Sequence, residues 1–181
     1  MIYLLLADGF EEIEALTVVD ILRRAKINVQ TVSVNGCISV AGAHGITVQA
    51  DITLDMVQKS ELEMLILPGG MPGTDNLEKS KEVIDLISYA SDNGKYIAAI
   101  CAAPKILGSM NLLNGKSAVC FPGYESELIG ANISEENVVI DGNIITSKAA
   151  GTASDFAFTL VEILCDGQTA HDISKKMFYK D

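Results

Sequence analysis

Short apolar runs alternate along the chain with longer segments whose apolar residues recur at helical spacing. Residues 2–7 are continuously apolar, which is typical of a strand buried on both faces of a parallel sheet. Residues 11–25 follow with an apolar residue every third position from Ile13 to Leu22, a period that predicts a helix. The same reading predicts strands at residues 29–34, 64–67, 96–100 and 118–121, helices at 81–91, 104–113, 152–165 and 170–178, and hairpins joining 37–40 to 46–50 and 138–141 to 143–146.

The alternation of strands and helices predicts an α/β fold. Strands separated by helices favour a doubly wound, mostly parallel sheet with helices on both faces. The 181 residues contain no internal repeat, linker or low-complexity stretch, so we expect one domain over residues 1–181. Ligands of such sheets bind beyond the carboxyl ends of the strands, and the residues that follow each strand are therefore the candidates for chemistry.

Composition and charge narrow the range of partners. Apolar residues make up 49% of the chain and charged residues 20%, as is usual for a globular protein. The net charge of −11 argues against nucleic acid and anionic membranes, because such a surface repels phosphate. No apolar run reaches the roughly 18 residues of a membrane span, and the apolar N-terminal segment has no basic leader. We therefore expect no membrane partner and a cytoplasmic location.

The common cofactor and metal motifs are missing from the sequence. The four cysteines show no CxxC spacing and the chain has two histidines, so we expect no Cys/His zinc site and no metal. Residues 115–117, Gly-Lys-Ser, lack the first glycine of a phosphate-binding loop, because position 110 is Met110. Neither GxGxxG nor GxSxG occurs. We therefore expect no cofactor.

The segment AAICAAP, residues 98–104, contains the first candidate for chemistry. An apolar strand runs into Cys101, and a helix begins within a few residues. A side chain on such a turn is forced outward, beside the free N–H groups of the helix N-terminus. These groups and the helix dipole favour a thiolate, and so predict a thiol pKa below the roughly 8.5 of free cysteine. A buried structural cysteine is the alternative.

The segment LPGG, residues 67–70, also stands at a predicted strand end. Paired glycines permit unusual backbone angles and the close approach of a ligand. The N–H groups of Gly69 and Gly70 therefore predict an anion pocket beside the sulfur, able to hold an oxyanion. An ordinary turn is the alternative explanation.

Three glutamates, Glu11, Glu12 and Glu14, follow the first predicted strand. Acidic residues in a first helical turn complement the helix dipole, and this explanation suffices for Glu11 and Glu12. Glu14 lies nearer the strand ends and is a candidate to point inward. Beside a thiolate its carboxyl would stay protonated and donate a hydrogen bond to the sulfur. A role in capping the helix is the alternative for Glu14 as well.

The order ADGFEEIE, LPGG, AAICAAP and TSKAAGT resembles the ThiJ/PfpI superfamily, and within it the branch that includes the human Parkinson disease protein seven. The likeness spans essentially the whole chain. It implies a flavodoxin-like fold and a homodimer. It also implies that Cys101 is the reactive, oxidisable cysteine of a nucleophile elbow, that Glu14 hydrogen-bonds it, and that Gly69, Gly70 and the Ala102 backbone form the oxyanion pocket.

The chain departs from the family's pattern in three places. Phe121 stands where many members carry a histidine that serves as base to the cysteine, so a Cys-His-acid peptidase triad is not supported. His44 falls near an arginine that this branch places at the dimer interface, and is a candidate to reach the partner subunit's site. A solvated loop histidine is the alternative. Lys148, Ala149 and Ala150 replace an Arg-Gly-Pro run, which alters the expected pocket rim.

The resemblance implies a cysteine-dependent enzyme acting on α-oxoaldehydes such as methylglyoxal or on their protein adducts, of the glyoxalase or deglycase type. One alternative is a redox-sensing or chaperone-like protein, in which oxidation of Cys101 changes its partners and Cys120 is a candidate resolving thiol. A cysteine peptidase or amidase is the third possibility, and Phe121 counts against it.

Overall fold

The computed structural model describes residues 1–179 and has a seven-stranded sheet at its centre, with strand order β10-β11-β7-β6-β1-β2-β5. All neighbouring strands are parallel except β10 and β11, which form an antiparallel hairpin at one edge. The strands of this sheet are β1 (Ile2–Leu6), β2 (Val29–Ser33), β5 (Ile52–Thr53), β6 (Met64–Leu67), β7 (Tyr96–Ile100), β10 (Val138–Asp141) and β11 (Ile144–Ser147). Two small sheets pair β3 (Ser39–Ala41) with β4 (Thr47–Gln49), and β8 (Ser117–Ala118) with β9 (Asn132–Ile133).

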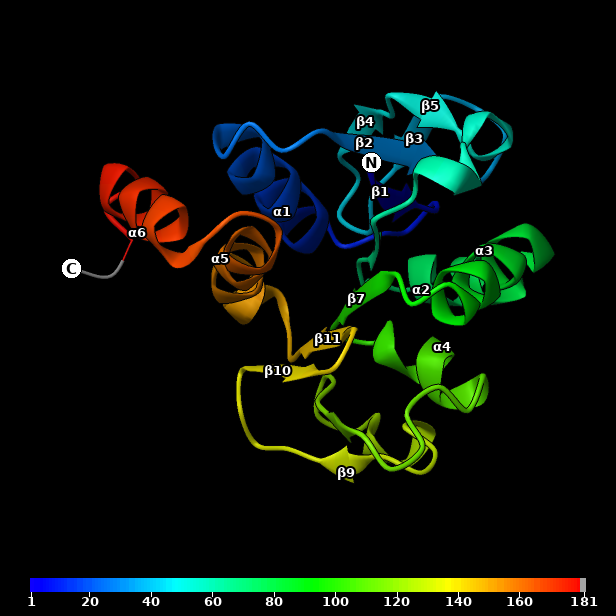
Figure 1. The fold of residues 1–181 in the computed structure, drawn as a ribbon. Helices are drawn as coiled ribbons and strands as arrows, with labels where there is room; N and C mark the ends of the chain where they lie inside the picture. Colours follow the sequence, from blue (N-terminus) through cyan, green and yellow to red (C-terminus); the bar gives the residue numbers. More distant parts are fainter. Residues whose placement is uncertain (180–181) are drawn as a thin grey trace.

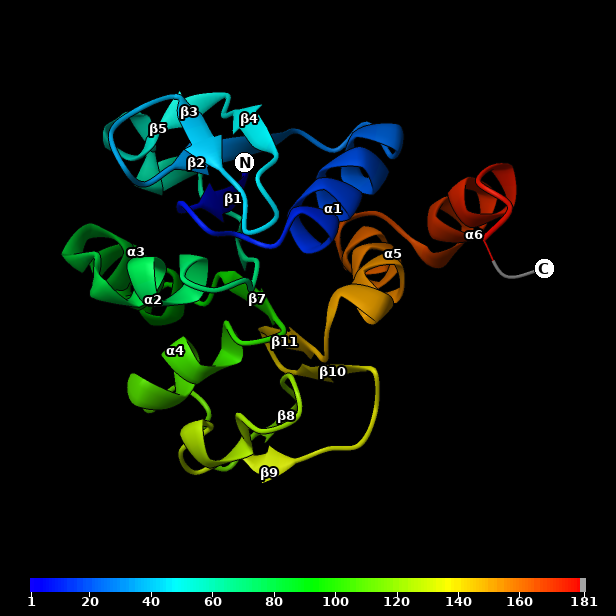
Figure 2. The ribbon, with the colours of Figure 1, turned by 180° about the vertical axis from the view of Figure 1, so that it is seen from behind.

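Helices cover both faces of the central sheet (Figure 1). Helices α1 and α5 pack on one face and α2, α3 and α4 on the other, while α6 packs against α5 on the outside (Figure 2). The α-helices are α1 (Glu12–Arg24), α2 (Gly73–Lys79), α3 (Lys81–Asp92), α4 (Pro104–Ser109), α5 (Ala153–Leu164) and α6 (Gly167–Lys176). Short 3-10 turns are η1 (Leu54–Met56), η2 (Lys59–Glu61), η3 (Glu125–Glu127) and η4 (Ala150–Thr152). The predicted doubly wound α/β fold is confirmed.

Strand β1 shows why the first apolar run is continuous. All five of its residues are buried. Ile2, Leu4 and Leu6 belong to the core beneath α1 and α5, whereas Tyr3 and Leu5 belong to the core beneath α3 and α4. Because side chains alternate along a strand, a strand covered on both faces needs an apolar residue at every position.

Two predicted elements are wrong in extent. The strand expected at residues 118–121 is limited to β8, which pairs with β9 outside the central sheet. Beyond β8 the chain turns toward the strand ends, where Val119 N donates to Thr146 Oγ1 and Phe121 N donates to the Cys101 carbonyl. The helix expected at residues 104–113 ends at Ser109, since Asn111 adopts a left-handed φ of +58°.

Other elements were missed or shifted. The sequence pattern did not predict α2, β5 or β9. The last helix begins at Gly167 rather than at residue 170, because the Asp166 side chain caps it by accepting a hydrogen bond from Thr169 N. None of the helices within residues 1–179 is both long enough and apolar enough to cross a membrane.

Candidate active site

Cys101 occupies the turn between β7 and α4 with a left-handed φ of +64°. Such an angle is uncommon for a residue other than glycine and persists only where the surroundings enforce it. Here Cys101 N donates to the Ser147 carbonyl at 2.9 Å, and the Cys101 carbonyl accepts from Phe121 N at 2.8 Å. The turn is thus held on both sides by neighbouring chain. The thiol stays partly exposed, unlike that of a cysteine sealed in the core.

Glu14 lies beside Cys101 at the start of α1 and is 1% exposed. Its Oε2 accepts a hydrogen bond from Gly69 N at 2.8 Å. The carboxyl also contacts the Cys101 thiol. The other carboxylate oxygen, Oε1, is buried and has no hydrogen-bond partner within residues 1–179. Glu14 therefore points inward, and the helix is capped instead by Glu11, whose Oε1 accepts from Ile13 N.

The two glycines of LPGG have different roles. Gly69 N is committed to Glu14, so its N–H does not join the predicted anion pocket. The backbone N–H groups of Gly70 and Ala102 face the Cys101 sulfur instead. Gly70 has a φ of +94°, and a Cβ there would lie 2.3 Å from Glu11 N, so only glycine fits this position. The candidate oxyanion donors are therefore Gly70 and Ala102.

Burial and charge set the proton balance of the Glu14–Cys101 pair. Burial raises the pKa of the Glu14 carboxyl to about 7, although the Cys101 contact and Gly69 N–H oppose the shift. Burial, and then the charge of Glu14, raise the pKa of the Cys101 thiol to about 12, and the N–H groups of Ala102 and Gly70 offset only part of this rise. The expected depression of the thiol pKa is therefore wrong, because burial, the largest cause, raises it.

The pair as a whole holds one proton between these two pKa values. Coupled groups lose their protons in steps that belong to the pair rather than to either residue. Between about pH 7 and about pH 12 one proton is shared by Glu14 and Cys101. When Glu14 carries it, the sulfur is an anion with a neutral carboxyl beside it, which is the arrangement expected from the sequence.

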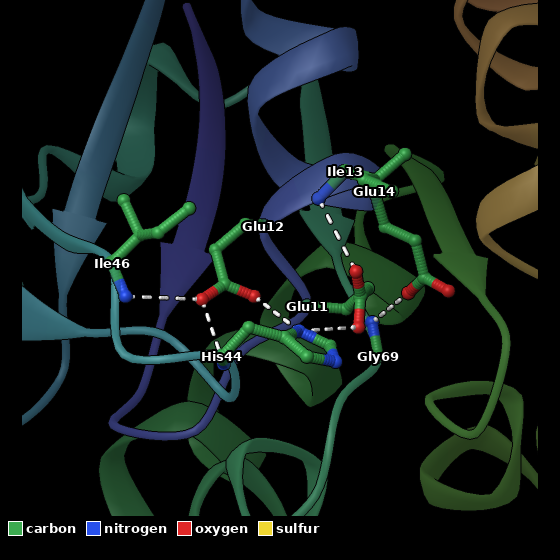
Figure 3. Close-up of polar contacts among 7 residues, drawn as sticks. All are labelled: Glu11, Glu12, Ile13, Glu14, His44, Ile46 and Gly69. Carbon is green, nitrogen blue, oxygen red and sulfur yellow. Dashed lines mark hydrogen bonds and ion pairs between the residues drawn. The ribbon is translucent and has the colours of Figure 1, made fainter.

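Glu12 and His44 form a second polar group at the same end of α1 (Figure 3). The His44 ring Nδ1 lies 2.9 Å from Glu12 Oε2 and 3.5 Å from Glu11 Oε2. The hydrogen bond to Glu12 raises the pKa of His44. Glu12 is 5% exposed. Its interaction with the helix dipole, which was expected to account for this residue, therefore does not suffice to explain why a carboxylate is buried here. His44 is exposed but paired within its own chain, and its approach to a partner subunit stays a prediction.

The remaining candidate residues are Phe121 and Cys120, and neither supplies a base to Cys101. Phe121 follows β8, and its exposed ring occupies the position expected for a histidine. Cys120 is 3% exposed, and burial raises the pKa of its thiol to about 11. A cavity of about 430 Å³ is lined by Cys120 and Lys148 but not by Cys101. A cavity of about 540 Å³ lined by Leu54 and Leu86 is not lined by Cys101 either, so the chemistry of the side chains locates the site better than cavity size does.

The chain is similar to known proteins over most of its length. Residues 1–163 match the DJ-1/PfpI family. The chain belongs to this family. It is 34% identical to protein dj-1beta of Drosophila melanogaster over 173 residues, which are 94% of this chain and 92% of that protein. It is 33% identical to protein DJ-1 homolog B of Arabidopsis thaliana over 94% of this chain, which spans only 39% of the plant protein.

Solved structures of the DJ-1/PfpI family have the same flavodoxin-like architecture. The Drosophila DJ-1beta crystal structure has a TM-score of 0.93 at 33% identity, covering 99% of this chain and 98% of that one. Oxidised DJ-1 of Toxoplasma gondii has a TM-score of 0.94 at 32% identity, with the same coverage. A protein of Pyrococcus abyssi named a deglycase is 28% identical over 90% of this chain and 98% of that protein.

Proposed function

We propose that the protein is a cysteine-dependent enzyme acting on α-oxoaldehydes such as methylglyoxal, or on their adducts with proteins. The observation that carries this proposal is the contact of the half-buried Cys101 with the buried Glu14 carboxyl, together with the N–H groups of Gly70 and Ala102 that face its sulfur. A nucleophile, a proton carrier and two oxyanion donors then lie around one reacting carbon. The deglycase name of the Pyrococcus relative supports the same class of substrate.

The proposed reaction needs water as its only co-reactant. The Cys101 thiolate adds to the aldehyde carbon, a C–S bond forms, and the oxygen is held by Gly70 and Ala102 before it takes a proton from Glu14. The Glu14 carboxylate then removes the hydrogen of the former aldehyde carbon to give an enediolate and returns that proton to the former ketone carbon, while the hydroxyl proton on the first carbon passes to the former ketone oxygen. The first carbon is oxidised and the second reduced, which leaves a thioester on Cys101. Water cleaves the thioester to lactate and restores the thiol.

Lactate production from methylglyoxal tests the proposal. Cys101→Ala should abolish turnover, and Glu14→Gln should lower it by about 100-fold or more, the usual contribution of a general acid–base group. Cys165→Ala removes another thiol of the chain, an exposed one, and should retain the wild-type rate. Turnover that survives Cys101→Ala in a folded protein would reject the enzyme proposal.

A redox-sensing role is the second candidate, and the oxidised state of the Toxoplasma structure favours it. Hydrogen peroxide would add one oxygen to the Cys101 sulfur and release water, giving a sulfenate, and a second peroxide would give a sulfinate. Stoichiometric oxidation of Cys101 without lactate production would favour this role over the enzyme. Phe121 still counts against a peptidase or amidase, because its ring cannot carry a proton.

We further propose a homodimer in the cytoplasm. Ile13 and Leu16 on α1 are 56% and 37% exposed, and Ile46, whose N–H bonds to Glu12, is 55% exposed. Clustered exposed apolar side chains are typical of association surfaces. Ile13→Glu should shift the mass in light scattering toward the monomer, whereas Ile129→Glu, at an equally exposed position, should not. A monomeric wild-type protein would reject the dimer.

A further inference from the structure

Glu11, Glu12 and His44 bring three donor atoms together from two segments of the chain (Figure 3). The glutamates begin α1, and His44 lies in the turn between β3 and β4. The His44 Nδ1 and one carboxylate oxygen from each glutamate lie within 4.8 Å of one another. Glu14, by contrast, points to the other side of the helix start, toward Gly69 (Figure 3). The cluster is therefore distinct from the Glu14–Cys101 pair, although the charge of Glu11 still acts on Glu14.

The surrounding backbone orients the donors. Glu12 Oε1 accepts from His44 N at 2.8 Å and from Ile46 N at 3.4 Å, which leaves Oε2 to face the ring. The turn itself is docked onto the helix start, because Gly9 N donates to the Ala41 carbonyl at 2.7 Å and Ala43 N donates to the Phe10 carbonyl at 2.8 Å. Such outer hydrogen bonds are what hold ligating carboxylates in place at metal sites.

A glycine makes room for the buried carboxylate. A Cβ at Gly42 would lie 2.3 Å from Glu12 Oε1, so any larger residue would push Glu12 out of place. Glu12 is consequently held at 5% exposure while the His44 side chain is 68% exposed. In the single chain the donors are fixed from the protein side, and the His44 ring is exposed on the other side.

The two spacings from His44 to the glutamates fit a metal coordination sphere. With bonds of about 2.0–2.2 Å, adjacent N and O ligands of Zn²⁺ lie about 3.0 Å apart in octahedral and about 3.4 Å in tetrahedral geometry. The His44 Nδ1 lies 2.9 Å from Glu12 Oε2 and 3.5 Å from Glu11 Oε2. One imidazole and two carboxylates suit Zn²⁺ and related divalent ions.

We propose that Glu11, Glu12 and His44 bind a divalent cation of the Zn²⁺ class, with water completing its coordination. The expectation of no metal rested on Cys/His spacing and left carboxylates out of the count. Nδ1 must be free of its proton to bind the metal, so the alternative for the same three residues is a protonated ring that bridges two carboxylates. The proposal does not depend on the reaction at Cys101.

Co²⁺ is the probe for this site, read at the histidine ring resonances by NMR. His44 and His171 are the two histidines of the chain, so each serves as the other's reference. Ring resonances separate this site from the exposed Cys37 and Cys165 thiols, which also attract soft cations. We expect one equivalent of Co²⁺ to shift His44 strongly and His171 little, and Zn²⁺ to displace it.

Two variants of the cluster and one control variant complete the test. Glu11→Gln and His44→Ala should each weaken Co²⁺ binding by at least about tenfold, whereas His171→Ala should leave it unchanged. His44 is exposed, so its replacement is compatible with folding. Circular dichroism of the variant checks this. A wild-type His44 resonance that Co²⁺ does not perturb would overturn the proposal and leave a proton as the only cation in the cluster. Equal binding by His44→Ala would overturn it as well.

Discussion

Replacing Gly69 with alanine tests whether the candidate site depends on a close backbone approach. A Cβ at this position would lie 2.7 Å from the Cys101 Cβ, 2.7 Å from Glu14 Oε2 and 3.1 Å from the Cys101 sulfur. Unstrained carbon contacts begin near about 3.5 Å, so these atoms must move apart by roughly 0.8 Å. The Cys101 Cβ is tied to the elbow backbone, so relief of that contact needs a shift of the backbone at residue 69, and the Glu14 carboxylate must move as well.

The displacement should lower activity far more than stability. A misplacement of about 1 Å in an active site lowers a rate by about 100-fold, and we expect that loss in kcat/KM for lactate production from methylglyoxal. The overpacked side chain should cost about 1–3 kcal/mol of unfolding free energy, measured by thermal denaturation.

Gly167→Ala is the matched control for this variant. A Cβ there meets no atom within 4 Å, so both the rate and the unfolding free energy should stay near the wild-type values. A folded Gly69→Ala protein with wild-type kcat/KM would refute the reasoning, because the Glu14 position would then not matter to the reaction.

Three further predictions concern the thiols and the core. Alkylation of Cys101 should rise as the pH passes about 7, because the protonated pair then loses its first proton, and mass spectrometry of Glu14→Gln should show no such step. Cys120 should be the last of the four thiols to react with iodoacetamide, since burial both shields it and raises its pKa to about 11, and a faster reaction than at Cys37 would contradict this. Phe156→Ala should lower the unfolding free energy by about 3–5 kcal/mol, while Phe178→Ala, at 85% exposure, should change it by less than about 0.5 kcal/mol in the same denaturant titration.

Much of the fold could be predicted because its strands are covered on both faces. A strand such as β7 (Tyr96–Ile100) then shows as an unbroken apolar run, and its bounds could be read to the residue. The region after residue 117 lacks this signal. Its backbone bonds to the Thr146 side chain and to the Cys101 carbonyl rather than to the backbone of a central strand, and no local pattern encodes such long-range partners.

The candidate site was predictable where chemistry follows a strand end. Cys101 and Gly70 could be found in this way, because parallel strands gather their carboxyl ends at one edge. The Glu12–His44 hydrogen bond was missed because it joins residues 32 positions apart and depends on the docking of a turn. The engagement of Gly69 N by Glu14 was missed for the same reason, since it joins residues 55 positions apart.

The raised pKa of the Cys101 thiol and its proposed role as a nucleophile are compatible. The charge of Glu14 is the second-largest cause of the rise, and it vanishes in the form where Glu14 carries the shared proton. Two backbone N–H groups, those of Gly70 and Ala102, then favour the sulfur anion, whereas the single N–H of Gly69 favours the carboxylate. A thiolate of high basicity is also the stronger nucleophile. Reactivity at this site is therefore decided by whether the Cys101 sulfur or the Glu14 carboxylate holds the shared proton. The backbone amides of the elbow and of LPGG set that balance.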